Sequence, residues 1–265
     1  MTSHSKITIV KVGGAVVEHP DSLNALLDRF AHIEGAKILV HGGGRLATDM
    51  ATKLAIPTQM VEGRRITDAE MLDVVIMVYA GLINKSIVAQ LQARQVNALG
   101  VCGADLRLIE AEKRPVKQID YGWVGDVKRC HVDTILPLLR NDVCLVVAPI
   151  SCDPATGQLL NTNADTIAAA LAQALAAASC EVTLLYCFEK KGVLRDVSDD
   201  NSLIPQLDLQ TYQSLKASQN IHSGMIPKLD NAFETLAQGV QAVWIMQADN
   251  LGQQLPIGTR LVIAS

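Results

Sequence analysis

The sequence lacks the patterns that mark secreted, membrane-spanning and nucleic-acid-binding proteins. Its net charge is −4 and no run of lysine or arginine exceeds two residues, so nucleic acid is not expected as a partner. The apolar stretch at 168–178 is interrupted by Gln173 and is too short to span a bilayer. The polar residues 1–6 lead straight into a strand-like segment, without the apolar region of a signal peptide. We therefore expect a cytoplasmic protein that binds neither membranes nor nucleic acids.

Cysteine pairs and a Walker-type phosphate loop are also missing. The six cysteines show neither the close spacing of a zinc site nor the density of a disulfide scaffold, which suits a reducing compartment. We expect them to be small buried hydrophobic residues, and no metal site is predicted. A Gly-Lys-Ser/Thr ending does not occur, which excludes a P-loop nucleotide site.

Strand-like and helix-like segments alternate along most of the chain, a pattern typical of a parallel sheet with helices on both faces. We therefore predict an α/β fold, a three-layer α/β/α sandwich with a mostly parallel central sheet. Between 96 and 130 the pattern changes to short strands and turns, which predict hairpins beside the main sheet. The predicted strands are 7–12, 37–41, 143–150, 182–187, 240–246 and 260–264, and the predicted helices are 21–33, 45–55, 67–93, 164–178 and 225–238.

A capping-box pattern opens the longest predicted helix. Thr67 stands three residues before Glu70, so Thr67 is predicted to cap a helix that reaches about Ala93. The apolar face of this helix suits either the core or a dimer seam. The chain has no low-complexity linker and is predicted to form a single domain. Its weakest boundary lies near Ser179, between an N-terminal lobe of about 1–178 and a C-terminal lobe of about 179–265.

Two glycine motifs follow the first two predicted strands. Lys11 precedes Gly13 and Gly14 at the strand end where α/β sheets commonly bind ligands. The glycines let backbone N–H groups approach a phosphate and Lys11 adds a positive charge; a plain turn with a solvated lysine is the alternative. After the second strand, His41 precedes Gly42-Gly43-Gly44 at a helix start. Three consecutive glycines cost conformational entropy, which favours an anion site that a ligand approaches closely.

The second motif also admits a dinucleotide-binding interpretation. Gly42, Gly44 and Ala47 match the spacing of a Rossmann turn, with Glu62 where the ribose-binding acid would stand. An NAD(P)-dependent oxidoreductase would follow. This interpretation leaves the Lys11 motif unexplained, and Glu62 lies in a turn-rich stretch after Pro57, so it is the weaker one.

Two basic motifs lie at helix starts. Arg65 precedes the long helix, where its guanidinium can hold a carboxylate through two parallel hydrogen bonds, whereas Arg64 is expected in solvent. Lys228 follows Pro227 in the first turn of a later helix. A positive charge is misplaced at that end of a helix unless it meets a phosphate held there. A solvated lysine is the ordinary alternative.

A polar motif joins a predicted strand to the Ala-rich helix. Asn161, Asn163 and Asp165 cluster at this helix start. A helix cap explains one asparagine. The other amide and Asp165 are then left for ligand binding.

In this order, over nearly the whole chain, the motifs resemble the amino-acid kinase family and, within it, the acetylglutamate kinases. The resemblance implies the fold of that family, with the amino-acid substrate on the N-terminal part, ATP on the C-terminal part, and a homodimer built on the N-terminal half. It rests on Lys11-x-Gly13-Gly14, His41-Gly42-Gly43-Gly44, Arg65-Ile66-Thr67, Asn161-Thr162-Asn163-Ala164-Asp165 and Gly224-Met225-Ile226-Pro227-Lys228.

The resemblance also implies roles for the matching residues. Lys11 and Lys228 would flank the transferring phosphoryl group, with Asp165 holding both lysines in place. The acylated amino acid would be bound by Gly43, Gly44, Arg65 and Asn161, and the nucleotide or its phosphates by Gly13, Gly14, Gly192, Gly224 and Lys190.

The implied reaction is ATP-dependent phosphorylation of the γ-carboxylate of an N-acylglutamate, by default N-acetyl-L-glutamate, in arginine biosynthesis. A carboxylate of pKa about 4 is already ionised at neutral pH, so no general base is needed. Positive charge from two lysines, glycine N–H groups and Mg²⁺ held mainly by ATP would suffice. N-succinylglutamate is an alternative substrate, because the sequence does not place the acyl pocket. A non-catalytic amino-acid sensor is the alternative of a different class.

Two features depart from the family pattern. Relatives carry Asp-x-x-Gly after the strand ending near Tyr186, whereas this chain reads Cys187-Phe188-Glu189-Lys190-Lys191-Gly192. One of the two lysines there could contact a phosphate or the ribose instead, or both are solvated. No extra helix precedes the first strand, the element that the resemblance links to arginine-inhibited hexamers. We therefore expect a dimer without strong arginine feedback.

Overall fold

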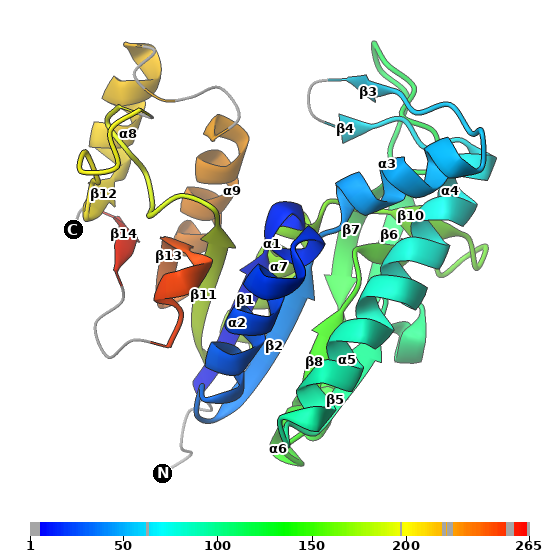
Figure 1. The fold of residues 1–265 in the computed structure, drawn as a ribbon, viewed down its shortest axis with the longest axis horizontal. Helices are drawn as coiled ribbons and strands as arrows, with labels where there is room; N and C mark the ends of the chain where they lie inside the picture. Colours follow the sequence, from blue (N-terminus) through cyan, green and yellow to red (C-terminus); the bar gives the residue numbers. More distant parts are fainter. Residues whose placement is uncertain are drawn as a thin grey trace.

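An eight-stranded sheet forms the centre of the computed structural model, which describes residues 6–61, 64–196, 198–218, 221, 225–252 and 257–263 (Figure 1). Its strand order is β12-β14-β13-β11-β1-β2-β8-β5, and each neighbouring pair is parallel except β13–β14. The predicted α/β fold is confirmed. The strands are β1 (Lys6–Val12), β2 (Ala36–His41), β5 (Ala98–Val101), β8 (Cys144–Val147), β11 (Glu181–Phe188), β12 (Gln206–Asp208), β13 (Ala242–Gln247) and β14 (Gly258–Val262).

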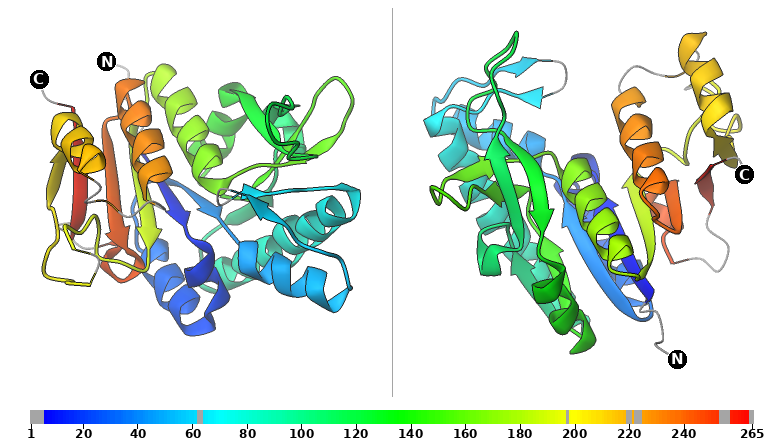
Figure 2. Two further views of the ribbon diagram at one scale, coloured as in Figure 1. Left: turned by 90° about the horizontal axis from the view of Figure 1, so that it is seen from above. Right: turned by 180° about the vertical axis from the view of Figure 1, so that it is seen from behind.

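Helices cover both faces of this sheet, and the left-hand view of Figure 2 shows the two layers. One layer holds α1 (Gly14–Glu18), α2 (Pro20–Ala31), α3 (Gly44–Lys53), α4 (Ala69–Val75) and α5 (Asn84–Ala93). The other holds α6 (Val132–Arg140), α7 (Ala164–Ala177), α8 (Leu209–Ala217) and α9 (Ile226–Ala237).

The inner strands are mostly apolar because both of their faces are buried. Along β1, Ile7 and Ile9 pack into the core under α7 and α9, whereas Val10 and Val12 pack into the core under α2 and α3. The side chain of Lys11 therefore projects on the face of Ile7 and Ile9, toward α7 and α9. One lysine is thus buried at the end of a strand that is otherwise apolar inside.

Two small sheets lie beyond the carboxyl ends of the central strands (Figure 1). The prediction of hairpins beside the main sheet at 96–130 is wrong in part, because β5 joins the central sheet. The predicted strand 143–150 divides between two sheets at Pro149, which has no N–H to donate to a ladder. The small sheets contain β6 (Ile109–Lys113), β7 (Gly125–Cys130), β9 (Ile150–Cys152) and β10 (Leu159–Asn161), and β3 (Met60–Val61) with β4 (Arg64–Arg65).

The long helix begins one residue later than predicted. Asp68, not Thr67, is the N-cap: its carboxylate accepts from the N–H of Met71 at 2.8 Å. The middle of the helix is a π-helix, η1 (Ile76–Ile83), which continues into α5. Two short α elements, α1 and α6, and the pair β12–α8 were not predicted; α6 carries an internal proline, Pro137, which hides its helical pattern.

The run Ala69–Ala93 is, by length and composition, long and apolar enough to cross a membrane, with a mean hydropathy of 1.7. Half of its most apolar window is buried inside the protein, as in a core helix.

Candidate functional site

Two lysines from distant parts of the chain meet at one carboxylate. The Nζ of Lys11 lies 2.6 Å from Oδ1 of Asp165, and the Nζ of Lys228 lies 3.8 Å from Oδ2. Lys11 is 5% exposed and the side chain of Asp165 is 14% exposed. The three residues lie at the end of β1 and in the first turns of α7 and α9. Positive charge from two ammonium groups and two helix N-termini is therefore concentrated at the carboxyl edge of the sheet.

The surroundings of this cluster lower the pKa of Asp165 and that of Lys228. Burial raises the pKa of Asp165. The nearby ammonium groups of Lys11 and Lys228 lower it by a larger amount, so the pKa falls below its usual range. Burial lowers the pKa of Lys228, and the nearby charge of Lys11 adds to this, while Asp165 opposes it. Asn163 caps α7 by accepting the N–H of Asp165 at 2.7 Å. Asn163 is the cap that the sequence required, and Asn161 and Asp165 are left for other roles.

The two glycine loops lie against each other beside the triad. A Cβ on Gly14 would lie 3.6 Å from the backbone nitrogens of both Gly43 and Gly44. Gly43 has a φ of 157°, and a Cβ there would lie 2.2 Å from a methyl group of Ile83, so only glycine fits. Within the described residues, no acceptor meets the N–H groups of Gly14, Gly43 and Gly44. These three donors can therefore bind an anion, whereas the N–H of Gly13 already donates to the carbonyl of Cys187 at 3.1 Å.

Arg65 contacts the second glycine loop, at Gly44. Its Nη2 donates to the carbonyl of Gly44 at 2.8 Å and to Oγ1 of Thr48 at 2.7 Å, and the residue is only 8% exposed. No carboxylate of the described residues lies within ion-pair distance of it. Nearby, Nδ2 of Asn161 donates to Oγ1 of Thr67 at 3.0 Å, which ties β10 to the start of the long helix. A buried guanidinium without a counter-ion is suited to a ligand carboxylate.

His41 is a structural residue of the glycine loop. It is completely buried, and its Nδ1–H donates to the carbonyl of Gly42 at 2.9 Å, which leaves Nε2 to accept from Nδ2 of Asn84 at 3.3 Å. Asn84 also donates to the carbonyl of Val146 at 2.9 Å. Burial lowers the pKa of His41 to about 4. The neutral imidazole thus fastens the glycine loop to α5.

This burial predicts a pH-dependent stability. Below pH 6.5 the unfolded chain protonates His41 while the folded protein does not until about pH 4, so stability falls as the pH drops through this window. We expect His41 to account for a loss of about 3 kcal/mol in the free energy of unfolding between pH 7 and 4. Urea unfolding at several pH values should show this loss in the wild type and in the control His32→Gln, an exposed histidine. His41→Gln should lack this part of the slope, and an unchanged slope would contradict the assignment.

The remaining predicted residues lie elsewhere or outside the described part. Gly192 packs against Thr259, whose nitrogen lies 2.9 Å from the position of an added Cβ. Lys190 pairs on the surface with Asp200 at 3.3 Å. Gly224 falls outside the described residues, as does Glu62 of the dinucleotide interpretation. One neighbour of the lysines was missed: the ring of Phe188, in the segment where the family pattern expects an aspartate, lies under both ammonium groups.

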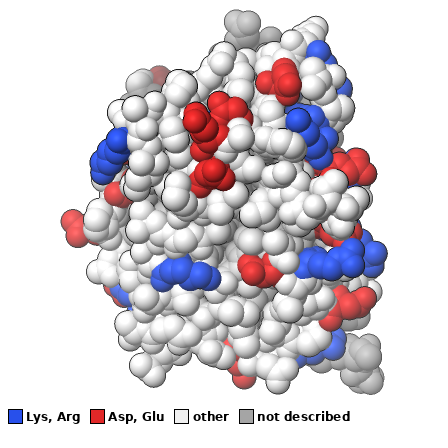
Figure 3. Space-filling model, turned by 90° about the vertical axis from the view of Figure 1, so that its right-hand side faces the viewer, with Lys and Arg blue, Asp and Glu red and all other residues white. Residues whose placement is uncertain are grey.

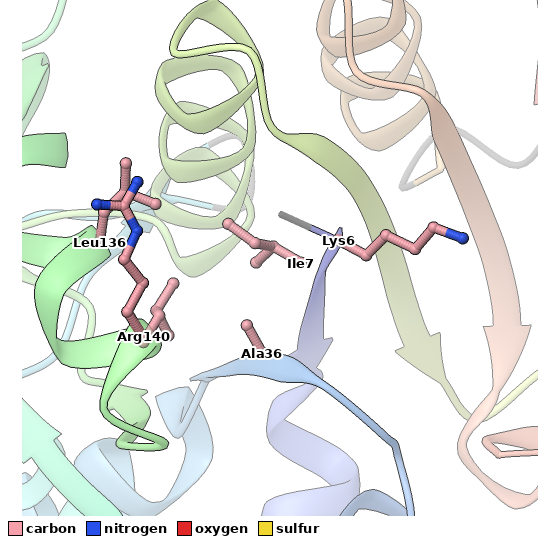
Figure 4. Close-up of a pocket in the computed structure, with 6 residues that line it drawn as sticks. Lys6, Ile7, Ala36, Leu136 and Arg140 are labelled. Carbon is pink, nitrogen blue, oxygen red and sulfur yellow. The ribbon is translucent and has the colours of Figure 1, made fainter. Parts of the chain in front are cut away.

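A separate cavity of about 200 Å³ lies at the opposite edge of the sheet (Figure 4). It is lined by Lys6, Ile7, Ala36, Leu136, Leu139 and Arg140. Figure 4 shows the side chain of Lys6 extending away from Arg140, so the two charges do not converge on one ligand. Within the described residues, no three His, Cys, Asp or Glu side chains gather as a metal site.

Comparisons with known proteins identify the family of this chain. The profile of the amino acid kinase family matches residues 6–247. An acetylglutamate kinase of Bacteroides fragilis is 56% identical over 243 residues, 92% of each chain, and one of Parabacteroides distasonis is 52% identical over 94% of this chain and 96% of its own. Among solved structures, smu.665 from Streptococcus mutans superposes with a TM-score of 0.77 at 26% identity, covering 97% of this chain and 98% of its own.

The chain therefore belongs to the amino acid kinase family. The resemblance to acetylglutamate kinases that the motifs indicated is confirmed at 50–56% identity to several of them. The oxidoreductase interpretation has no support from these relatives.

Proposed function

We propose that this protein transfers the γ-phosphoryl group of ATP to the γ-carboxylate of N-acetyl-L-glutamate, a step of arginine biosynthesis. The observation that carries the proposal is the convergence of Lys11 and Lys228 on Asp165, beside three glycine N–H donors. The high identity to proteins named acetylglutamate kinase supports the substrate.

The charges of the site match the needs of phosphoryl transfer. An oxygen of the substrate carboxylate forms a bond to the γ-phosphorus while the bond from that phosphorus to the β,γ-bridging oxygen breaks, which releases ADP and an acyl phosphate. The ammonium groups of Lys11 and Lys228 would neutralise the charge on the phosphoryl oxygens in the transition state. Asp165 would hold both lysines in position. The N–H groups of Gly14, Gly43 and Gly44 would bind the remaining oxygens.

A magnesium ion would enter with the nucleotide. Both carboxylate oxygens of Asp165 face ammonium groups, so this residue is poorly placed as a metal ligand. We infer that Mg²⁺ is held mainly by the phosphates of ATP, where it supplies further charge neutralisation.

The substrate would lie on the N-terminal lobe, about 1–178, and ATP on the C-terminal lobe, about 179–265. Arg65 contacts the glycine loop there, and Asn161 contacts Thr67. The two side chains would bind the carboxylate and the amide of the acylated amino acid, together with Gly43 and Gly44. The proposal of a single domain is supported by the central sheet, in which β1 pairs with β11 along the whole length of β1. Both substrates would therefore meet at the carboxyl ends of these two strands. We place the enzyme in the cytoplasm.

Arg65 offers a direct test of the substrate side. We expect Arg65→Lys to raise the KM for the acylglutamate roughly 10- to 100-fold, because a lysine cannot make two parallel hydrogen bonds to a carboxylate. The KM for ATP should stay within about twofold. Steady-state kinetics with each substrate varied in turn would measure this. Arg64→Lys, in the exposed neighbouring arginine, is the matched control, and an equal rise in both KM values would contradict the placement.

The proposed reaction itself is tested by trapping its product. Purified protein is incubated with Mg-ATP and either N-acetylglutamate or N-succinylglutamate, and hydroxylamine captures the acyl phosphate. Trapped product with N-acetylglutamate as the faster substrate is the expected result. A faster reaction with N-succinylglutamate would assign a succinyl group to the substrate instead of an acetyl group. Binding of ligand without product from either substrate would favour a non-catalytic amino-acid sensor.

We also propose a homodimer across the edge formed by the long helix and β5. Strand β5 is the last strand of the central sheet, so one of its edges is unpaired within the described chain. Three large apolar side chains are exposed on this side: Met77 at 53%, Leu82 at 54% and Leu99 at 39%. Figure 3 views this side of the molecule, where uncharged residues dominate and charged side chains are scattered between them. A second copy would cover this apolar surface and the sheet edge together.

Light scattering tests the dimer. We expect a mass about twice the 28.5 kDa of the chain, and a monomer for the double variant Met77→Asp/Leu82→Asp, because two carboxylates would be buried without partners. Leu209→Asp, which changes a leucine of α8 that is 39% exposed, should leave the mass unchanged. A double variant that keeps the wild-type mass would place the interface elsewhere, and a hexamer would overturn the dimer.

A further inference from the structure

The ring of Phe188 lies under both lysines of the site. The Nζ of Lys228 is 3.8 Å from the ring centroid and that of Lys11 is 4.9 Å from it. Both distances are within the range of a cation–π interaction, in which an ammonium group is attracted by the negative face of an aromatic ring. One ring therefore contacts the two cations that also meet at Asp165.

Packing holds the ring in this place. Phe188 is the last residue of β11, and in the parallel register Tyr186 pairs with Lys11, so Tyr186, Phe188 and Lys11 share one face of the sheet. The rings of Tyr186 and Phe188 are parallel within 2°, with centroids 6.2 Å apart. The hydroxyl of Tyr186 donates to the carbonyl of Asp165 at 3.5 Å. On another side, a Cβ on Gly13 would lie 3.5 Å from Cδ1 of Phe188.

The charge balance of the site indicates an electrostatic role for the ring of Phe188. Two ammonium groups share a single carboxylate, and Lys228 lies 3.8 Å from it, beyond an ordinary hydrogen bond. The charged groups that act on Lys228 are Asp165, Lys11 and Glu189. The like charges of Lys11 and Lys228 repel each other, and burial adds to the cost of keeping Lys228 charged. A negative ring face offsets this cost without adding a carboxylate, which would repel the phosphates of a nucleotide.

We propose that Phe188 is a positioning residue of the phosphoryl-transfer site, whose ring face attracts the ammonium groups of Lys11 and Lys228 and directs them toward the transferring phosphoryl group. The inference rests on the proposed function of the two lysines. It assigns the ring an electrostatic role, distinct from the filling of space in the core.

Fluorinated phenylalanines separate these two roles, because fluorine withdraws charge from the ring face with little change in size. We would incorporate 4-fluoro-, 3,5-difluoro- and 3,4,5-trifluorophenylalanine at position 188 in the full chain and measure kcat, both KM values and the pH profile of kcat. We expect kcat to fall stepwise with each fluorine, by about 5- to 30-fold in total. The basic limb of the profile should move to lower pH, because Lys228 loses its proton more readily. The KM for the acylglutamate should not change.

The same substitutions at Phe233 are the matched control. That ring also stacks on a tyrosine, Tyr212, and lies on α9, the helix that carries Lys228, and no ammonium group of the described residues lies over it. We expect no stepwise trend there. A trifluorinated Phe188 enzyme within twofold of the wild-type kcat, or the same decline at both positions, would overturn the proposal.

A second readout separates this inference from the proposed function. The pKa of Lys228 can be followed by NMR in protein with isotope-labelled lysine, with the signal assigned by its loss in Lys228→Arg. If the wild type made no acyl phosphate, the proposed function would fail, and this pKa would still test the ring. A stepwise fall with fluorination would support the contact, and an unchanged pKa would overturn it.

Discussion

Replacing Lys11 by alanine is expected to lower kcat by roughly 10²- to 10³-fold, the usual effect of removing one group that stabilises charge in a transition state. Lys11 is only 5% exposed and its ammonium group lies 2.6 Å from a carboxylate oxygen of Asp165, so water cannot readily take its place. The same loss is expected for Lys228→Ala. The KM values should change much less than kcat, because phosphoryl oxygens carry the charge in question mainly during transfer. Hydroxylamine trapping under saturating substrates measures the effect.

Lys216→Ala is the matched control for both variants. It removes a lysine of α8 that also pairs with an aspartate, Asp230, but this pair is exposed on the surface, with side chains 41% and 48% accessible. We expect its kcat to remain within about twofold of the wild type. A Lys11→Ala protein that is folded by circular dichroism and retains a tenth or more of the wild-type kcat would remove Lys11 from the mechanism.

Asp165→Asn is expected to reduce both stability and activity. The substitution keeps the shape of the side chain but leaves two ammonium groups without the carboxylate that they share. Breaking a buried ion pair from one side costs about 3–5 kcal/mol of unfolding free energy, and we expect a loss of this order. We also expect kcat to fall by roughly 100-fold or more, because the lysines lose the group that directs them. Urea unfolding at pH 7 and the trapping assay measure the two effects.

The exposed ion pair of Lys190 and Asp200 supplies the comparison for stability. Asp200→Asn removes the carboxylate that Lys190 contacts and should change the free energy of unfolding by less than about 1 kcal/mol. An Asp165→Asn protein as stable as the wild type would show that the two ammonium groups do not depend on this carboxylate. A stable variant with wild-type kcat would remove Asp165 from the site.

Local patterns were sufficient for the central strands, and they indicated most residues of the candidate site. Apolar runs bounded by turns identify β1, β2 and β11, because parallel strands are buried on both faces. Glycine runs and polar residues at helix starts also carry a local signal, since a glycine run has a conformational cost and a lysine in a first helical turn is electrostatically unfavourable. Lys11, Asp165 and Lys228 were recognised on these grounds and by resemblance.

Local sequence patterns were less informative where one segment could adopt two different structures. Thr67 and Asp68 can both cap a helix, and Asp68 does so because the hydroxyl of Thr67 accepts from Asn161, which comes from a strand 94 residues away. The strand predicted at 143–150 ends at Pro149 because its two halves find partners in different sheets. The N–H of Gly13 was expected to face a phosphate, and it is used by the carbonyl of Cys187 on the adjacent strand.

The sequence by itself determined most of the order of strands and helices, the family, and which residue types could bind an anion, because each of these depends on residues close together in the chain. Only the tertiary structure decided which of those residues meet. The parallel register of β1 and β11 brings Phe188 beneath Lys11, and the packing of α9 beside α7 brings Lys228 to Asp165 across 63 positions. Distances of this kind are set by the packing of whole elements, which no local pattern records.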